Sequence, residues 1–152
     1  MIIFAERALT SEGWKQNVAV EVGKDGKIAA VTPHASADDA NMQVSCLLPA
    51  PVNVHSHAFQ RAMAGLTEQR GPAGSDSFWT WRKRMYELAG KMRPELLAAV
   101  ARQAYNEMLT SGYTTVAEFH YLHRDPATGS AGTTMLEALL DARAAWDARL
   151  GA

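Results

Sequence analysis

The chain has 152 residues and a formal net charge of −1, and 47% of its residues are hydrophobic while 20% are charged. This composition is that of an ordinary soluble globular protein, and the near-zero charge gives no electrostatic reason to expect nucleic acid or an acidic membrane surface as a partner. Cys46 is the only cysteine, which excludes an intrachain disulfide and favours a reducing, cytoplasmic compartment. The N-terminus lacks the pattern of a signal peptide, and no apolar run approaches the ~20 residues of a membrane-spanning helix.

The first part of the chain, residues 1–48, is predicted to be β-rich. Residues 17–22 alternate, with three valines on one face, and the pair Asp25-Gly26 is typical of a hairpin turn that leads into a return strand over residues 27–32. A polar loop and two short apolar runs are expected next, at residues 33–43, 44–48 and 52–54.

Helical periodicity begins further along the chain. Asp76 or Ser77 can cap a helix that continues through Trp81, Met85 and Leu88. A longer helix is predicted over residues 95–111, between Pro94 in its first turn and a C-terminal Gly112. Residues 113–119 then read as a buried strand. This order of strand, long helix and strand predicts adjacent parallel strands at residues 52–54 and 113–119 in an α/β fold.

The last part, residues 126–152, is predicted to be helical. Thr134 and Glu137 have the spacing of a capping box. The expected apolar face consists of Leu136, Leu139, Leu140, Arg143, Trp146 and Leu150.

Two histidines, His55 and His57, follow the short apolar strand at residues 52–54. Residues two apart on a strand point to the same face, so both imidazoles can reach one ion, and neutral imidazole suits zinc. The carboxyl end of a parallel barrel strand is also where such enzymes place their chemistry.

Three stretches, in the same order, resemble the formimidoylglutamate deiminases of histidine degradation, within the amidohydrolase superfamily. They are residues 49–66, which contain His-Ser-His-Ala-Phe-Gln-Arg, residues 76–82 and residues 112–121. The resemblance covers residues 1–125 and implies zinc-dependent hydrolysis of N-formimidoyl-L-glutamate to N-formyl-L-glutamate and ammonia. It implies that His55 and His57 are zinc ligands and that Gln60, Arg82 and Tyr121 contact the substrate. A homodimer is among the assemblies that it allows.

Other interpretations apply to several of these residues when they are considered one at a time. On spacing alone Arg82 would be a solvated helix charge, and Trp79 and Trp81 would be packing residues. Histidines outside the pair are expected at the surface or around the metal site without binding it, and Cys46 is expected in the core; the histidines are His34, His120 and His123.

The resemblance also predicts an incomplete barrel. A full (β/α)8 barrel takes ~250 residues, whereas the residues after the β-rich region suffice for the first two to three βα units at ~30 residues each. The family's later zinc ligands and its general acid and base fall beyond Ala152, so no catalytic residue is assigned. We expect residues 49–125 to form the first barrel units and residues 126–152 to diverge from the family. Ala50 stands where the family has glycine, which predicts a strained turn.

The leading hypothesis is therefore the N-terminal fragment of a zinc-dependent deiminase, inactive by itself. One alternative is another amidohydrolase, such as a deaminase or chlorohydrolase acting on a purine or triazine ring. The other is a catalytically dead remnant that serves as a binding module. The motif that ends in Arg82 favours an acyclic, acidic substrate, because an aromatic base needs no carboxylate clamp.

Overall fold

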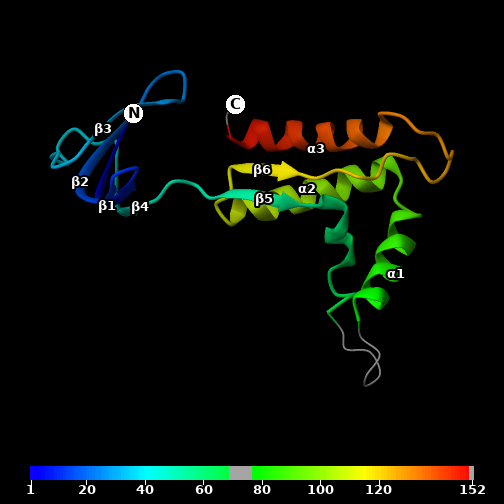
Figure 1. Cartoon of the computed structure of the whole chain (residues 1–152). Coiled ribbons are helices and arrows are strands. Elements are labelled where there is room, and N and C mark those ends of the chain that lie inside the picture. Colours follow the sequence, from blue (N-terminus) through cyan, green and yellow to red (C-terminus); the bar gives the residue numbers. More distant parts are fainter. Residues whose placement is uncertain (69–76, 151–152) are drawn as a thin grey trace. The chain divides into compact units, whose positions relative to one another are not determined.

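The computed structural model describes residues 1–68 and 77–150, which fall into two compact units, Met1–Ala50 and Pro51–Ala152 (Figure 1). Among the described helices, none combines the length and the apolar character needed to cross a membrane.

The first unit is a four-stranded sheet in the order β3-β2-β1-β4, in which β1 is antiparallel to β2 and parallel to β4. Its core contains Ala5 and Ala8 of β1, which are buried beside the alternating residues Val18 and Val20 of β2. The predicted β-rich region and its hairpin are confirmed, and Gly26 in the turn has a φ of +76°. The strands are β1 (Ile2–Thr10), β2 (Gly13–Val22), β3 (Ile28–Thr32) and β4 (Met42–Leu47).

The prediction of a strained turn at Ala50 is wrong. Among the described residues, only Asn17 and His34 have a positive φ without being glycine. Ala50 therefore occupies ordinary backbone space, and alanine is tolerated there without cost.

The second unit contains two parallel strands, β5 (Val52–Ser56) and β6 (Thr115–Glu118), with Val52 opposite Thr115. The predicted parallel pairing is confirmed. Between the strands lie a short 3₁₀ helix and two α-helices, and a third α-helix follows β6. They are η1 (Ala58–Met63), α1 (Phe78–Ala89), α2 (Pro94–Thr110) and α3 (Thr134–Leu150).

The ends of α1 and α2 follow the expected chemistry. The Ser77 hydroxyl accepts a hydrogen bond from the Thr80 backbone N–H at 3.4 Å, and the Ser77 N–H donates to the Thr80 hydroxyl at 3.0 Å, which forms a capping box. Asp76, the other candidate cap, lies outside the described residues. Pro94 opens α2, and Gly112 follows its end with a φ of +88°.

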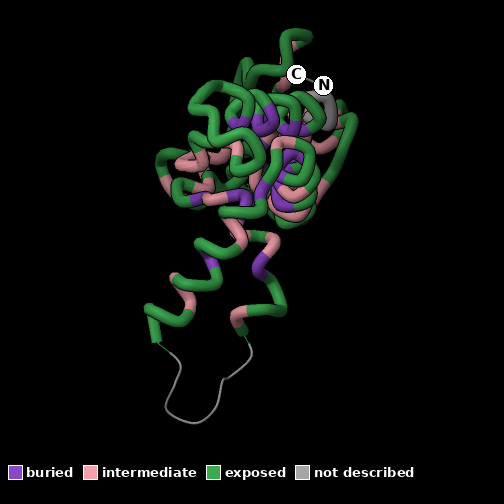
Figure 2. Tube along the Cα trace, turned by 90° about the vertical axis from the view of Figure 1, so that its right-hand side faces the viewer, coloured by how far each residue is buried: buried purple, intermediate pink, exposed green. Residues whose placement is uncertain are grey.

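The core of the second unit forms where η1 and α3 pack against α2. α1 contributes one buried residue, Met85, and the chain on both sides of the undescribed segment is largely exposed (Figure 2). The buried side chains of α2 are Leu97, Ala98, Ala101, Ala104 and Tyr105.

The predicted apolar face of α3 is wrong by part of a turn. Leu136 and Leu140 are 42% and 50% exposed, while the side chains that pack inward are Met135, Ala138, Leu139, Ala142 and Trp146. Both stripes are largely apolar, and the stripe with the two small residues Ala138 and Ala142 allows closer approach to α2. The helix begins at Thr134, one residue earlier than the capping pattern suggests, and the Thr133 hydroxyl that precedes it donates to Glu137 at 2.6 Å.

The expectation of a buried strand over residues 113–119 also needs correction. β6 is shorter, and its residues alternate between exposed and half-buried. Val116 packs against the helical core, whereas Thr115 and Ala117 are exposed. Helices therefore cover only one face of this strand in the described part of the chain.

Candidate metal and substrate site

The two imidazoles of the His-x-His motif converge at the end of β5. The Nε2 atoms of His55 and His57 lie 3.1 Å apart, with the rings edge to face. The strand is irregular here, because its register with β6 shifts between Asn53 and Ser56 and the Asn53 side chain accepts a hydrogen bond from the His55 N–H. Local irregularity of this kind re-aims side chains at strand ends.

The end of β6 holds the segment that carries His57. The Phe119 N–H donates to the Ser56 carbonyl at 2.9 Å, and the His57 Nδ1 lies 3.0 Å from the Phe119 carbonyl oxygen. The Glu118 carboxylate accepts from the Ala58 N–H at 2.7 Å. A carbonyl beside Nδ1 fixes the proton on that nitrogen, which leaves the Nε2 lone pair free to bind a metal.

The geometry of the pair fits two ligands of one tetrahedral ion. Nitrogen ligands at about 2.0–2.1 Å from a tetrahedral zinc lie roughly 3.3 Å apart, close to the observed 3.1 Å. Within residues 1–68 and 77–150, no group of three or more His, Cys, Asp and Glu side chains could hold a metal. The described residues therefore supply two ligands and not a closed site.

All five residues singled out from the sequence line a single shallow cavity of about 540 Å³. The Gln60 side-chain amide donates to the Tyr121 hydroxyl at 2.7 Å, and the Tyr121 ring packs edge-on against His57. Burial raises the pKa of Tyr121, and the hydrogen bond from Gln60 opposes this in part. Tyr121 therefore stays a neutral phenol at neutral pH. The five are His55, His57, Gln60, Arg82 and Tyr121.

Arg82 is half-buried and lies on α1. Its guanidinium carbon is 5.5 Å from the centre of the Trp79 ring and 5.2 Å from that of Tyr86, and it donates to the Tyr86 hydroxyl at 3.1 Å. No carboxylate pairs with Arg82 among the described residues. Stacking and one hydrogen bond orient the group and leave donors for another anion.

The sequence analysis missed several residues of this cavity. Tyr86 and Met85 lie on α1, and Phe119 follows β6. The helical spacing of Trp79, Arg82 and Tyr86, three and four residues apart, was a signal that could have found the aromatic clamp. Phe119 carries no comparable pattern. Phe78 and Trp81 also line the cavity, and Trp81 was considered above only as a packing residue of the helix.

Two other histidines lie outside this cavity. His120 and His123 pack with ring centres 5.2 Å apart. His120 lines a separate cavity of about 380 Å³ beside β6 and α3, together with Glu118. Burial, aided by nearby His123, lowers the pKa of His120. His34 and Cys46 are exposed, so Cys46 is not the core residue that we expected.

Paired histidines at the carboxyl end of parallel strands are an arrangement that enzymes of the (β/α)8 barrel type use for their chemistry. Residues 46–148 match the amidohydrolase family, and the chain belongs to this family. Residues 1–43 match the family described as "Formimidoylglutamate deiminase HutF, N-terminal domain". The amidohydrolase match extends past Asp125, where the resemblance seen in the sequence ended, and includes most of α3.

Individual relatives agree with this assignment. Formimidoylglutamate deiminase from Pseudomonas aeruginosa is 54% identical over 123 residues, which make up 81% of this chain and 27% of that protein. 8-Oxoguanine deaminase from the same organism is 37% identical over 90 residues, 59% of this chain and 19% of that protein. The chain thus spans between a fifth and a little over a quarter of these relatives.

A solved structure shares the fold of the chain. The amidohydrolase from Brucella melitensis superimposes with a TM-score of 0.82 and 39% sequence identity, over 99% of this chain and 33% of that one. This match includes α3, so the C-terminal helix belongs to the shared fold.

Proposed function

We propose that this chain forms the N-terminal part of a zinc-dependent formimidoylglutamate deiminase. The reaction is the hydrolysis of N-formimidoyl-L-glutamate to N-formyl-L-glutamate and ammonia. In this proposal His55 and His57 hold the metal, and Gln60, Arg82 and Tyr121 bind the substrate. The free, exposed thiol of Cys46 supports a cytoplasmic location.

A single observation carries the proposal: a guanidinium with no carboxylate partner among the described residues lines the same cavity as the histidine pair. N-formimidoyl-L-glutamate has a neutral or cationic C=N group on its α-nitrogen and two carboxylates, one on the adjacent α-carbon and one at the end of the side chain. Arg82 suits a carboxylate, because its planar fork can form two parallel charge-assisted hydrogen bonds.

The other residues have matching roles. Zinc, when bound, supplies the Lewis acidity that activates water for attack on the formimidoyl carbon. His57 presents Nε2 because the Phe119 carbonyl keeps the proton on Nδ1. Gln60 and Tyr121 are already hydrogen-bonded to each other and offer neutral donors and acceptors that orient the substrate without adding charge.

The second candidate is a deaminase that acts on a purine ring, supported by the similarity to 8-oxoguanine deaminase. A neutral purine carries no carboxylate, so it would leave the half-buried Arg82 without an anion. The higher identity to formimidoylglutamate deiminase, 54% against 37%, agrees with the acidic substrate.

The experiment joins residues 1–125 to the remaining portion of the Pseudomonas aeruginosa formimidoylglutamate deiminase and measures ammonia release. We expect hydrolysis of N-formimidoyl-L-glutamate and none of 8-oxoguanine, with loss of activity in His55→Ala and His57→Ala. The matched control is His34→Ala, which changes an exposed histidine outside the site. Activity that survives both site substitutions would contradict the proposal.

A further inference from the structure

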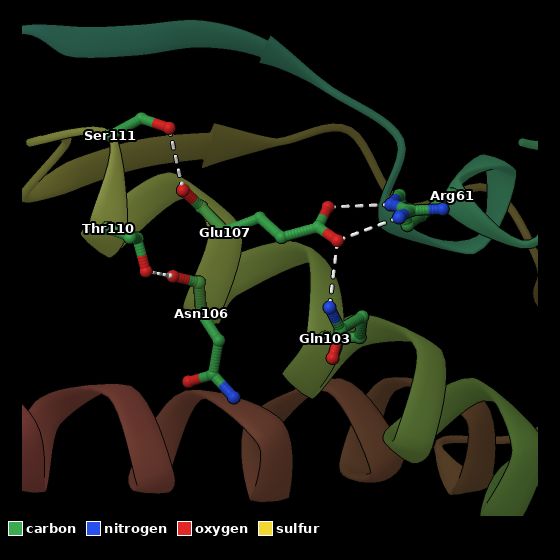
Figure 3. A network of polar contacts seen from close by, with 6 residues as sticks. All are labelled: Arg61, Gln103, Asn106, Glu107, Thr110 and Ser111. Atoms are coloured by element: carbon green, nitrogen blue, oxygen red, sulfur yellow. Dashed lines mark hydrogen bonds and ion pairs between the residues drawn. The ribbon is translucent and has the colours of Figure 1, made fainter.

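Arg61 and Glu107 join η1 to α2 in the closest ion pair among the described residues. The Arg61 Nε lies 2.6 Å from one carboxylate oxygen of Glu107, and a terminal nitrogen lies 2.7 Å from the other (Figure 3). The Gln103 side chain, one turn earlier on α2, donates to the same carboxylate at 2.8 Å. The two partners are 46 residues apart in the sequence.

The pair differs from an ordinary surface ion pair in its geometry. Exposed pairs contribute little when their side chains are free to move, but a two-bond fork held by a third residue is directional. The hydrogen bonds from Arg61 and then Gln103 lower the pKa of Glu107 to about 2, so the carboxylate stays charged across the neutral range.

η1 directly follows the candidate metal ligand and contains the candidate substrate contact. His57 precedes its first residue, Gln60 lies within it, and Arg61 comes next. With three residues per turn in a 3₁₀ helix, neighbouring side chains diverge by about 120°. Gln60 faces Tyr121 and the cavity, while Arg61 faces α2.

Apolar packing alone does not fix the rotation of this short helix. η1 buries Ala58, Phe59 and Met63 against the core, but apolar contacts are non-directional. The side chain of His57, the N-cap residue of η1, forms no capping hydrogen bond. Besides the hydrogen bond from Gln60 to Tyr121, the directional contacts of η1 are those of Glu118 at its start and of Arg61 near its end.

We propose that the Arg61–Glu107 pair is a positioning device that sets the rotation of η1 and thereby holds His57 and Gln60 at the cavity. The part that concerns His57 rests on the proposed function, because that function makes His57 a metal ligand. Neither Arg61 nor Glu107 lines the cavity, so the pair acts through η1 and does not touch the substrate.

The test uses the full chain and four proteins: wild type, Glu107→Gln, the exchanged pair Arg61→Glu with Glu107→Arg, and Asp147→Asn. Asp147→Asn is the matched control, because Asp147 forms an exposed ion pair with Arg143 on α3, away from η1. The first readout is the NMR signal of the Gln60 side-chain amide without metal. The second is the affinity for Zn²⁺.

We expect Glu107→Gln to shift the Gln60 signal and to weaken Zn²⁺ binding by about tenfold, the lower end for residues that support metal ligands. The exchanged pair should restore both to near the wild-type values, and Asp147→Asn should change neither. Added KCl should bring the wild-type affinity toward that of Glu107→Gln, since salt screens exposed charges.

Unchanged Gln60 signals and unchanged Zn²⁺ affinity in Glu107→Gln would overturn the proposal. The proposal would also fail if the exchanged pair did not restore the Gln60 signal and the Zn²⁺ affinity that Glu107→Gln changes. Circular dichroism checks that all variants are folded. A wild-type chain that does not bind Zn²⁺ while Glu107→Gln still moves Gln60 would refute the metal role of His57 and leave the positioning role intact.

Discussion

At the scale of single residues, Arg82 best distinguishes the proposed substrate from its rivals. Two aromatic rings and the Tyr86 hydroxyl orient its guanidinium. Both rings come from neighbouring turns of α1 and hold the guanidinium in one orientation, and a lysine ammonium would lack the planar two-bond fork that this group presents. The environment of Arg82 therefore favours recognition of an anion over a purely solvated charge.

We predict that Arg82→Lys, in the joined enzyme, lowers kcat/KM for N-formimidoyl-L-glutamate. Losing a charge-assisted two-bond contact costs about 2–3 kcal/mol, a factor of roughly 30–150. The loss should vanish for a formimidoyl substrate that lacks the carboxylate. Lys83→Arg, an exchange of the same kind at the exposed neighbouring position, is the control and should have no effect. Equal losses on both substrates would mean that Arg82 supports the fold.

At the scale of helices and strands, an element could be predicted from the sequence where its residue pattern is compatible with only one structure. Pro94 and Gly112 bracket α2, and a long helix between two short apolar runs leads to the parallel pair of β5 and β6. The inward face of α3 could not be predicted, because two overlapping apolar stripes exist and only contact with α2 selects one of them. The irregular register of β5 near His55 likewise depends on β6.

The packing of α3 gives a direct stability prediction. Ala142 is 1% exposed on the face toward the core, so Ala142→Leu should overpack the α2–α3 contact and lower the free energy of unfolding by about 1–3 kcal/mol. Ala144→Leu makes the same change at an exposed position of the same helix and should have almost no effect. Urea denaturation measures the free energy of unfolding of both variants. Equal losses in the two would contradict the assignment of Ala142 to the inward face of α3.

The η1–α2 contact gives a prediction about pH. The pKa of Glu107 is lowered from 4.5 to about 2, so its contribution to stability is present above pH 4.5 and is lost as the pH falls through about 2. Carboxyl-carbon NMR should show Glu107 still charged near pH 3. Arg61→Met should move the titration midpoint of Glu107 up toward 4.5. A midpoint that this substitution leaves unchanged would show that Arg61 does not lower the pKa of Glu107.

At the scale of the whole molecule, motifs with fixed spacing identified the family and the candidate site before any contact was known. The His-x-His motif and the stretches near Arg82 and Tyr121 come from three separate elements that meet at one cavity. Tyr86 was not assigned in this way, although its four-residue spacing from Arg82 places the two on one face of the predicted helix. Arg61 and Glu107, 46 residues apart, carry no signal that pairs them in a single sequence.

The central claim is that His55 and His57 bind the metal, and a zinc titration of the chain with ¹⁵N-labelled histidines tests it most directly. We predict that the Nε2 signals of both residues shift together, with weak affinity, because two imidazoles are two ligands short of a closed zinc site. The signals of His34, His120 and His123 should stay unchanged. Unmoved Nε2 signals of His55 and His57, with zinc bound at other histidines, would contradict the account.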